Sequence, residues 1–257
     1  MSKLSLFTAA LVLSAGTLIW AAAEKDAARV PVLLELFTSE GCSSCPPADR
    51  LLEYFDNKQP VAGADLFVLC EHVDYWDCAS WRDRFSSPQC TARQQDYTNK
   101  YHLNGVYTPQ LVVDGQFGLV GSDAGGATAA IREAIREPRV PIAISNVTRD
   151  GDRVTAHIDL PEASRDFKGA RGTLFVAIAD NRAESHVGGG ENAGASLAHV
   201  AVMRVLRQVG AVDLDTASAK DVTLTLQRGA GVTGLRFVAF VQDTRSGHVL
   251  GVAAQKL

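Results

Sequence analysis

The sequence predicts an α/β domain over residues 29–138, followed by a mainly antiparallel, sandwich-like β domain over residues 139–257. The first prediction rests on strand-length apolar segments that alternate with segments of helical periodicity. The second rests on short alternating segments after Pro141, separated by Asp-Gly and Ser-Gly turns. A chain of 257 residues with 46% hydrophobic residues is large enough to bury the core that either domain needs.

The first half of the chain contains the α/β pattern. Parallel strands joined through a helix cross over right-handed, so the first two strands should lie side by side and end at the same edge of the sheet. The pair Asp114–Gly115 between two apolar runs predicts a two-residue hairpin. Residues 71–104 are longer than a minimal connection and are expected to form a helical insert. The expected strands are 31–37, 65–70, 111–113 and 116–120, and the expected helices are 46–57, 93–100 and 127–136.

The second half has the period-two alternation of half-buried strands. Residues 196–208 fit either a strand or a helix. The expected strands are 142–147, 154–160, 173–179, 222–226, 235–241 and 249–253.

Two cysteines with CxxC spacing, Cys42 and Cys45, lie between the first strand and the first helix. A helix leaves its first N–H groups unpaired and carries partial positive charge at that end, so a thiolate at Cys42 would be stabilised there. Zinc sites share this spacing but need about four ligands, and no second CxxC occurs. The pattern favours redox chemistry over the alternative, a closed structural bridge, which would stabilise little because its loop is so short.

A second signature, Tyr107-Thr108-Pro109, opens an apolar strand. Proline is tolerated at the first residue of a strand, and an X-Pro bond can be cis at modest cost. We expect the backbone of Thr108 to pair with an extended substrate beside the thiols, with Tyr107 contacting the same substrate.

The order of strand, CxxC, helix, strand, Thr-Pro, strand, Asp-Gly and strand resembles a thioredoxin fold. Residues 35–49, 72–77 and 107–109 resemble secreted thioredoxin-like proteins of a bacterial family catalogued only as a domain of unknown function, and residues 190–194 and 237–243 resemble its second half. The resemblance implies an exported thiol-disulfide oxidoreductase with no settled substrate. In that mechanism Cys42 exchanges with a substrate disulfide, and Cys45 resolves the mixed disulfide.

Glu35 lies within an otherwise apolar strand, so its carboxylate is expected under the active site. Burial raises the pKa of a carboxyl group, which would suit proton exchange with Cys45. Thioredoxins have a buried acid similarly placed, although here it lies one residue further from the first cysteine. The alternative is a carboxylate satisfied by backbone donors.

His72 and Asp74 follow the second strand at the edge that carries the thiols, and both are expected to contact substrate. A second hypothesis is a copper-binding or copper-delivery protein in which Cys42, Cys45 and His72 hold a soft metal. A third is a non-catalytic protein that binds an envelope partner. The redox hypothesis requires no cofactor and no metal.

Three further cysteines complete the five in the chain. Cys78 and Cys90 bracket a polar excursion and are expected to form a structural disulfide in an oxidising compartment. Cys70 ends an apolar run and is expected to be a buried core thiol. The other histidines show no ligand spacing and are expected on the surface or in strands; they are His102, His157, His186, His199 and His248.

The first 23 residues have a basic start, an apolar centre and small residues before a cleavage site after Ala23, which predicts an export signal and a periplasmic or secreted protein. The alternative is an uncleaved anchor, because residues 4–23 are just long enough to span a bilayer. The net charge is −4, and neither half has the basic stripe that nucleic-acid binding needs. The expected partners are protein thiols and disulfides of the cell envelope, with no membrane span after signal cleavage; the sequence does not indicate an oligomeric state.

Overall fold

The computed structural model describes residues 29–226 and 234–257. The expected signal segment, residues 1–23, lies outside the described residues. The strands are β1 (Val30–Thr38), β2 (Ala64–His72), β3 (Gln110–Val113), β4 (Phe117–Val120), β5 (Ala143–Asp150), β6 (Arg153–Leu160), β7 (Arg171–His186), β8 (Ser196–Asp213), β9 (Ser218–Thr225), β10 (Leu235–Asp243) and β11 (Val249–Lys256). The helices are α1 (Pro46–Lys58), α2 (Pro88–Lys100) and α3 (Ala124–Ala134), and Arg165–Phe167 form one 3₁₀ turn.

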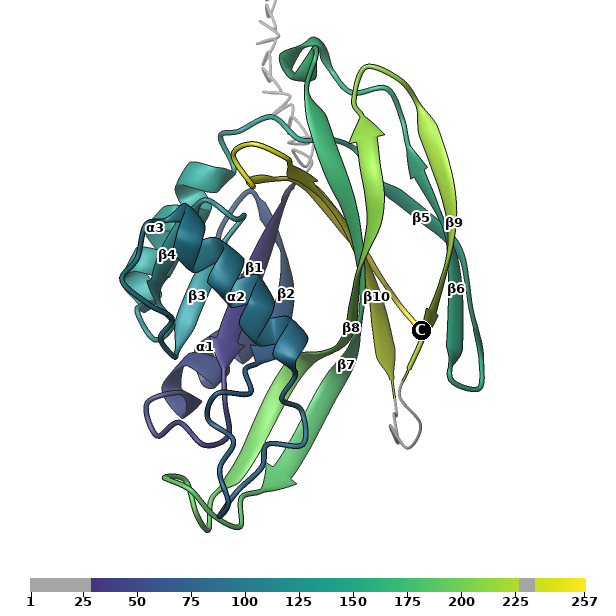
Figure 1. Cartoon of the computed structure of the whole chain (residues 1–257). Coiled ribbons are helices and arrows are strands. Elements are labelled where there is room, and N and C mark those ends of the chain that lie inside the picture. Colours follow the sequence, from purple (N-terminus) through teal and green to yellow (C-terminus); the bar gives the residue numbers. More distant parts are fainter. Residues whose placement is uncertain (1–28, 227–233) are drawn as a thin grey trace, which may run out of the picture.

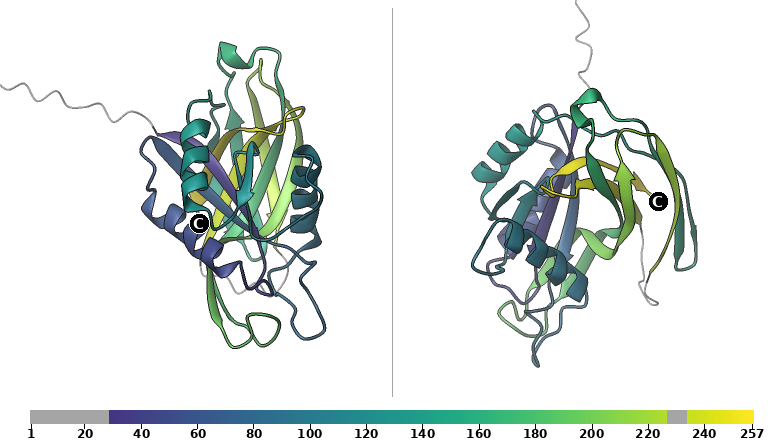
Figure 2. Two further views of the ribbon diagram at one scale, coloured as in Figure 1. Left: turned by 90° about the vertical axis from the view of Figure 1, so that its left-hand side faces the viewer. Right: turned by 45° about the horizontal axis from the view of Figure 1, so that its top comes forward.

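Eight strands form one mixed sheet in the order β11-β10-β7-β8-β2-β1-β3-β4 (Figure 1). β1 pairs with β2 in parallel and with β3 antiparallel. β2 also pairs in parallel with β8, with Cys70 opposite Val202. A second sheet, β5-β6-β9, lies on the side away from the helices (Figure 2).

The predicted fold class, a thioredoxin-like α/β domain followed by a β domain, was wrong. Of the described residues, 46% lie in strands and only 18% in helices. The strands β1 to β4, which were assigned to the α/β domain, belong to the same sheet as β7, β8, β10 and β11. The physical reason is the parallel pairing of β2 with β8, which uses the backbone edge of β2 and extends the sheet into the second half of the chain.

Two hydrophobic cores stabilise this arrangement. The first packs α1 and α3 and both faces of β1 and β2 together with residues of β8, β10 and β11, so the two halves of the chain share it. The second fills the space between the three-stranded sheet and the strands β7 and β10, where alternate side chains such as Val154, Ile158 and Phe237 are fully buried. The stability of the described part of the chain therefore depends on contacts between its two halves.

The individual elements lie close to the expected segments. Residues 196–208, which fitted strand or helix, form part of the long strand β8, because this segment pairs along β7. The insert contains α2, whose first turn begins at Pro88 and is capped by Ser87, whose hydroxyl accepts from the Gln89 N–H at 3.1 Å.

The hairpin predicted at Asp114–Gly115 is present, although its connection has three residues, 114–116, and not two, because Val113 pairs with Phe117. The turn also joins the two halves of the chain. Both residues have positive φ, +49° and +61°, as a type I′ turn requires. The Asp114 carboxylate accepts from Leu33 N–H at 2.7 Å and from Arg139 Nη2 at 2.5 Å, and the Asp114 carbonyl accepts from Val249 N–H at 2.7 Å. The turn therefore connects β1, β11 and the segment after α3.

This buried carboxylate gives a prediction for pH dependence. Burial outweighs the Arg139 charge and raises the pKa of Asp114 to about 6. The folded protein then holds a proton that the unfolded chain releases near pH 4, so stability should fall, by as much as roughly 3 kcal/mol, as pH rises from about 4 to 6. Urea unfolding across this range should show that fall in the native protein. Asp114→Asn should remove it, and an unchanged pH profile in this variant would contradict the assignment.

Candidate functional site

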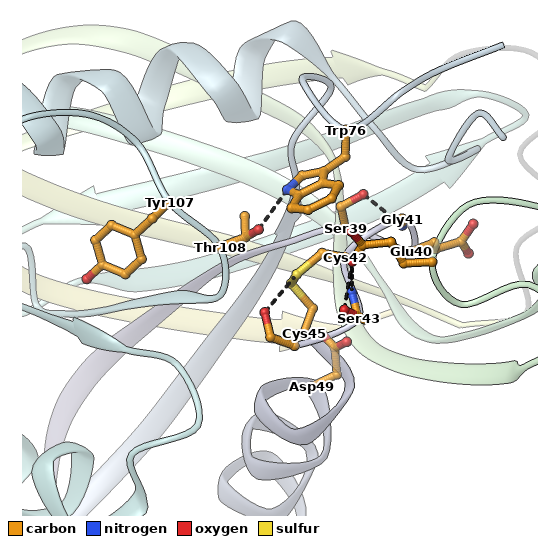
Figure 3. Close-up of a disulfide and its surroundings, with 12 residues drawn as sticks. Ser39, Glu40, Gly41, Cys42, Ser43, Cys45, Asp49, Trp76, Tyr107 and Thr108 are labelled. Carbon is orange, nitrogen blue, oxygen red and sulfur yellow. Dashed lines mark hydrogen bonds between the residues drawn. A yellow bond between two sulfur atoms is a disulfide. The ribbon is translucent and has the colours of Figure 1, made fainter. Parts of the chain in front are cut away.

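Cys42 and Cys45 form a disulfide at the start of α1, with their Cα atoms 5.4 Å apart (Figure 3). Cys45 is the N-cap residue of the helix, and Pro46 follows it at the first helical position. Both cysteines are fully buried, whereas Ser43 and Ser44 between them are exposed. The disulfide therefore lies just beneath the surface, with the two serines above it.

The backbone donors expected at this helix start are not free. Pro46 and Pro47 have no N–H, and the N–H groups of Ala48 and Asp49 both donate to the Cys45 carbonyl, at 2.8 and 3.1 Å. Ser44 Oγ lies 3.3 Å from Cys42 Sγ. A thiolate at Cys42 would thus be stabilised by the helix dipole and by the Ser44 hydroxyl.

Replacing Ser44 should therefore raise the pKa of the Cys42 thiol in the reduced protein. One lost hydrogen bond to a thiolate corresponds to about half to one pKa unit. Ser43→Ala is the matched control, because the Ser43 hydroxyl donates to Glu191 Oε2 at 2.7 Å. The pH dependence of alkylation, measured in a Cys78→Ser background, should shift in Ser44→Ala and not in Ser43→Ala; equal profiles would contradict this role.

The Thr108–Pro109 segment lies beside the disulfide. The peptide bond between these residues is cis, and Pro109 is buried. Trp76 packs against Gly41 and donates from Nε1 to Thr108 Oγ1 at 2.7 Å, so it bridges the CxxC loop and this segment (Figure 3). Tyr107 and Thr108 are partly exposed. The structure thus brings together four of the predicted site residues: Cys42, Cys45, Thr108 and Pro109.

The turn between β7 and β8, residues 187–195, covers the other side of the motif; we call it the hairpin tip. Glu191 Oε2 accepts from the Ser43 N–H at 3.0 Å and from the Ser43 hydroxyl. Asn192 Nδ2 donates to the carbonyls of Glu40 and Cys42, both at 2.9 Å. The hydroxyl and the N–H of Ser43 hold the pKa of Glu191 below its usual value. The hairpin tip contains residues 190–194, whose sequence resembles the second half of the family, but the sequence did not indicate that Glu191 and Asn192 contact the CxxC motif.

Glu35 does not lie beneath the thiols, which corrects its predicted position. Side chains alternate along a strand, and Leu36 packs on the α1 side while Glu35 points to the opposite face. There Glu35 accepts from Arg93 Nε and, at 2.5 Å, from the Tyr97 hydroxyl. Its polar partners are thus side chains of α2.

Two of the predicted substrate contacts are engaged within the protein. His72 is fully buried, and its Nδ1 lies 2.7 Å from Asp83 Oδ2. Asp74 accepts from the Thr91 hydroxyl at 2.5 Å and so connects to α2. Neither side chain lies free beside the disulfide, so the prediction that they contact substrate does not fit the structure.

The predicted Cys78–Cys90 disulfide is not formed. Cys78 is an exposed thiol in a turn, 3.1 Å from Ser80 Oγ, whereas Cys90 is buried in the first turn of α2. A disulfide requires a specific geometry between the two cysteines, and their spacing along the chain carried no information about it. The burial of Cys70, in contrast, is confirmed.

Asp83 organises the region behind the CxxC loop. Its carboxylate accepts from the N–H groups of Glu40 and Phe85, both at 2.9 Å, and contacts His72. Although burial opposes ionisation, His72 and these donors lower the pKa of Asp83 to about 2. Burial raises the pKa of Glu40, which also accepts from the Ser185 hydroxyl of β7. These contacts fix the segment that leads into Cys42.

Three potential metal ligands meet in this same region: Cys70, His72 and His199. Their ligand atoms all lie within 4.8 Å of one another, and each side chain is at most 1% exposed. His199, expected on the surface or in a strand, is a buried residue of β8. The copper hypothesis expected His72 beside Cys42 and Cys45. Within the described residues, His72 groups instead with Cys70 and His199.

The model of one protein family, described as a protein of unknown function (DUF1223), matches residues 33–242. The chain belongs to the DUF1223 family. No curated protein matches it. Among the described residues of this DUF1223 chain, none of the helices is both long and apolar enough to cross a membrane.

Two solved structures resemble this DUF1223 chain over most of its length. Protein AGR_C_4864 from Agrobacterium tumefaciens is 26% identical with a TM-score of 0.64, and the match covers 89% of this chain and 94% of that one. HBP35 of Porphyromonas gingivalis is 17% identical with a TM-score of 0.64, and the match covers 91% and 77%. Since each similarity covers about nine tenths of the DUF1223 chain, the shared fold is not confined to the segment predicted as an α/β domain.

Proposed function

We propose that the protein is a thiol-disulfide oxidoreductase that exchanges disulfides with other proteins through Cys42 and Cys45. The observation that carries the proposal is the Cys42–Cys45 disulfide at the start of α1, beside the partly exposed Thr108. Thr108 lies outside the strands and helices. Its hydroxyl accepts a hydrogen bond from Trp76 Nε1, and no hydrogen bond from its backbone to another described residue is found. Its backbone is therefore available to an extended substrate chain.

The exchange runs through a mixed disulfide. A substrate thiolate attacks Cys42 Sγ, the bond between the two protein sulfurs breaks, and Cys45 leaves as a thiolate. A second substrate thiolate then attacks the substrate sulfur of the mixed disulfide and releases the Cys42 thiolate. The substrate is oxidised and the protein is reduced by two electrons; the reverse sequence reduces a substrate disulfide.

Access to the sulfurs requires movement of the covering residues, because Cys42 and Cys45 are fully buried in the closed arrangement. The hairpin tip is attached to the motif by polar contacts from Glu191 and Asn192. Such contacts are weak enough to open locally without global unfolding. We infer that opening of the hairpin tip precedes exchange.

The test is the reduction potential of the Cys42–Cys45 pair. A Cys78→Ser variant, which removes the exposed free thiol, is equilibrated against glutathione buffers, and alkylated thiols are counted by mass spectrometry. A reversible two-electron transition that disappears in Cys42→Ser is expected. If the disulfide stays closed across the buffers, or opens only on denaturation, the pair is structural and the proposal is wrong.

We also propose that the protein acts in the cell envelope on protein thiols or disulfides, because residues 1–23 have the pattern of an export signal. Expression in a bacterial host followed by N-terminal sequencing of the periplasmic fraction should give a chain that begins at Glu24. Recovery of the intact N-terminus in the cytoplasm would contradict export.

A further inference from the structure

We propose that Cys70, His72 and His199 bind one zinc or copper(I) ion. The three residues form a buried cluster separate from the Cys42–Cys45 pair, so the inference does not depend on the proposed exchange reaction. It rests on where the strands place the side chains, on ring nitrogens without partners, and on the carboxylates beside the two histidines.

The strands bring the three ligands to one point. Cys70 and His72 are two residues apart in β2 and therefore point to the same face of the sheet. His199 comes from β8, the parallel neighbour of β2. The ligand atoms lie within 4.8 Å of one another, and ligand atoms bound at about 2.0–2.3 Å to one ion are separated by roughly 3.3–4 Å. Small rotations of the side chains would close the site.

The imidazole nitrogens lack partners where partners are expected. His72 Nε2 and both nitrogens of His199 are buried and have no hydrogen bond to any described residue. Buried polar atoms are paired in the great majority of cases, because leaving one without a partner is destabilising. A bound ion would satisfy these atoms, since a neutral imidazole nitrogen is a lone-pair donor.

The carboxylates around the cluster match the usual support of metal-binding histidines. Asp83 Oδ2 lies 2.7 Å from His72 Nδ1, which directs the proton of the ring to Nδ1 and leaves Nε2 as the donor to a metal. Asp49 Oδ1, from α1, lies 3.7 Å from His199 Nδ1. Each ring therefore has an acidic side chain next to it.

The ligand types limit the choice of ion. Thiolate sulfur favours copper(I) and zinc, and imidazole favours zinc, copper, iron and nickel, so zinc and copper suit both. Calcium and magnesium prefer oxygen ligands and are excluded by this set. Copper(I) can be held by these three ligands alone, which suits their full burial, whereas zinc would take a fourth ligand, such as a water molecule or the Asp49 carboxylate beside His199.

An ion at this position would link the two halves of the chain. It would join β2 to β8 directly at the junction of the sheet. It would also fix His72 and, through Asp83, the Glu40 N–H that precedes the CxxC motif. Thermal stability is therefore a readout that is independent of any exchange activity.

The test uses the full chain carrying Cys42→Ser and Cys45→Ser, so that neither active-site sulfur can bind metal. After treatment with a chelator, the protein is titrated with Zn²⁺ and, separately and without oxygen, with Cu⁺, in competition with a coloured chelator. We expect one ion per chain for at least one metal and a raised melting temperature. Cys70→Ser and His199→Asn should weaken binding roughly tenfold or more. Cys90→Ser, which removes another buried free thiol, should bind as the parent does.

A spectroscopic measurement on the parent protein keeps the proposal testable if a ligand variant fails to fold. Co²⁺ bound by this cluster should give a thiolate-to-cobalt charge-transfer band, and X-ray absorption of the zinc or copper form should show one sulfur and two nitrogen neighbours. The proposal is overturned if neither metal binds near one ion per chain, if the band is missing, or if Cys70→Ser and His199→Asn bind as the parent does.

Discussion

Replacing Arg93 by methionine is expected to lower the free energy of unfolding by about 3–5 kcal/mol, because it leaves a buried carboxylate without its counter-ion. Arg93 is 8% exposed, and its Nε donates to Glu35 Oε1, while Nη2 donates to the Tyr97 hydroxyl at 2.9 Å. Its guanidinium also lies 5.3 Å from the ring centre of Phe175 and 5.0 Å from that of Phe240. Methionine retains much of the apolar contact and removes the charge.

Urea unfolding of the variant and of the native protein measures this loss. Arg82→Met is the control, because Arg82 is exposed and lies 3.6 Å from Asp77, so its removal should cost less than about 1 kcal/mol. Adding Glu35→Gln to Arg93→Met should recover part of the stability, since the unpaired charge is then gone. A loss of under 1 kcal/mol in Arg93→Met, or no recovery in the double variant, would contradict the assigned role of the pair.

Replacing Asn192 by alanine is expected to accelerate reduction of the Cys42–Cys45 disulfide by about 5- to 150-fold. The change removes the donors to the Glu40 and Cys42 carbonyls. Two such bonds contribute roughly 1–3 kcal/mol, so the open population of the hairpin tip should rise by about 5- to 150-fold. The effect lies in the rate, because opening controls access to the sulfurs.

The measurement is the rate of reduction by dithiothreitol, followed by trapping of free thiols. Asn181→Ala is the matched control, because Asn181 Nδ2 donates to the Leu235 carbonyl at 3.1 Å, on strands remote in sequence from the CxxC motif. The Asn181→Ala protein should have a lower free energy of unfolding, but its Cys42–Cys45 disulfide should be reduced no faster than that of the native protein. An unchanged rate in Asn192→Ala, or an equal acceleration in both variants, would show that the hairpin tip does not control access.

Features that depend on neighbours in sequence were predictable. The Asp114–Gly115 turn follows from residues that tolerate positive φ, and Gly115 also admits the Gly247 carbonyl, which would lie 2.3 Å from an added Cβ. The start of α1 was predictable because Pro46, which follows the N-cap residue Cys45, is favoured at the first position of a helix. In each case the chemistry that determines the structure lies within a few residues.

Features that depend on distant pairing were not predictable. The parallel contact between Cys70 and Val202 joins residues more than a hundred positions apart, and no local pattern encodes it. The merged sheet, the burial of His199 and the position of the hairpin tip all follow from that contact. The spacing of Cys70 and His72, two residues apart in a strand, was a weak indication of the buried ligand cluster, because it places both side chains on one face. The predicted disulfide between Cys78 and Cys90 was wrong for the same reason, because spacing along the chain does not determine distance in space.

The pairing of β2 with β8 has a consequence for any truncated form of this protein. A fragment that ends near residue 138 would lose β8 and turn β2 into an edge strand with an open row of N–H and C=O groups. The middle of β2, Leu66–Cys70, is strongly apolar, and an exposed apolar edge strand is a template for pairing with other chains. Such a fragment should aggregate, and the CxxC site is best studied with the C-terminal half attached.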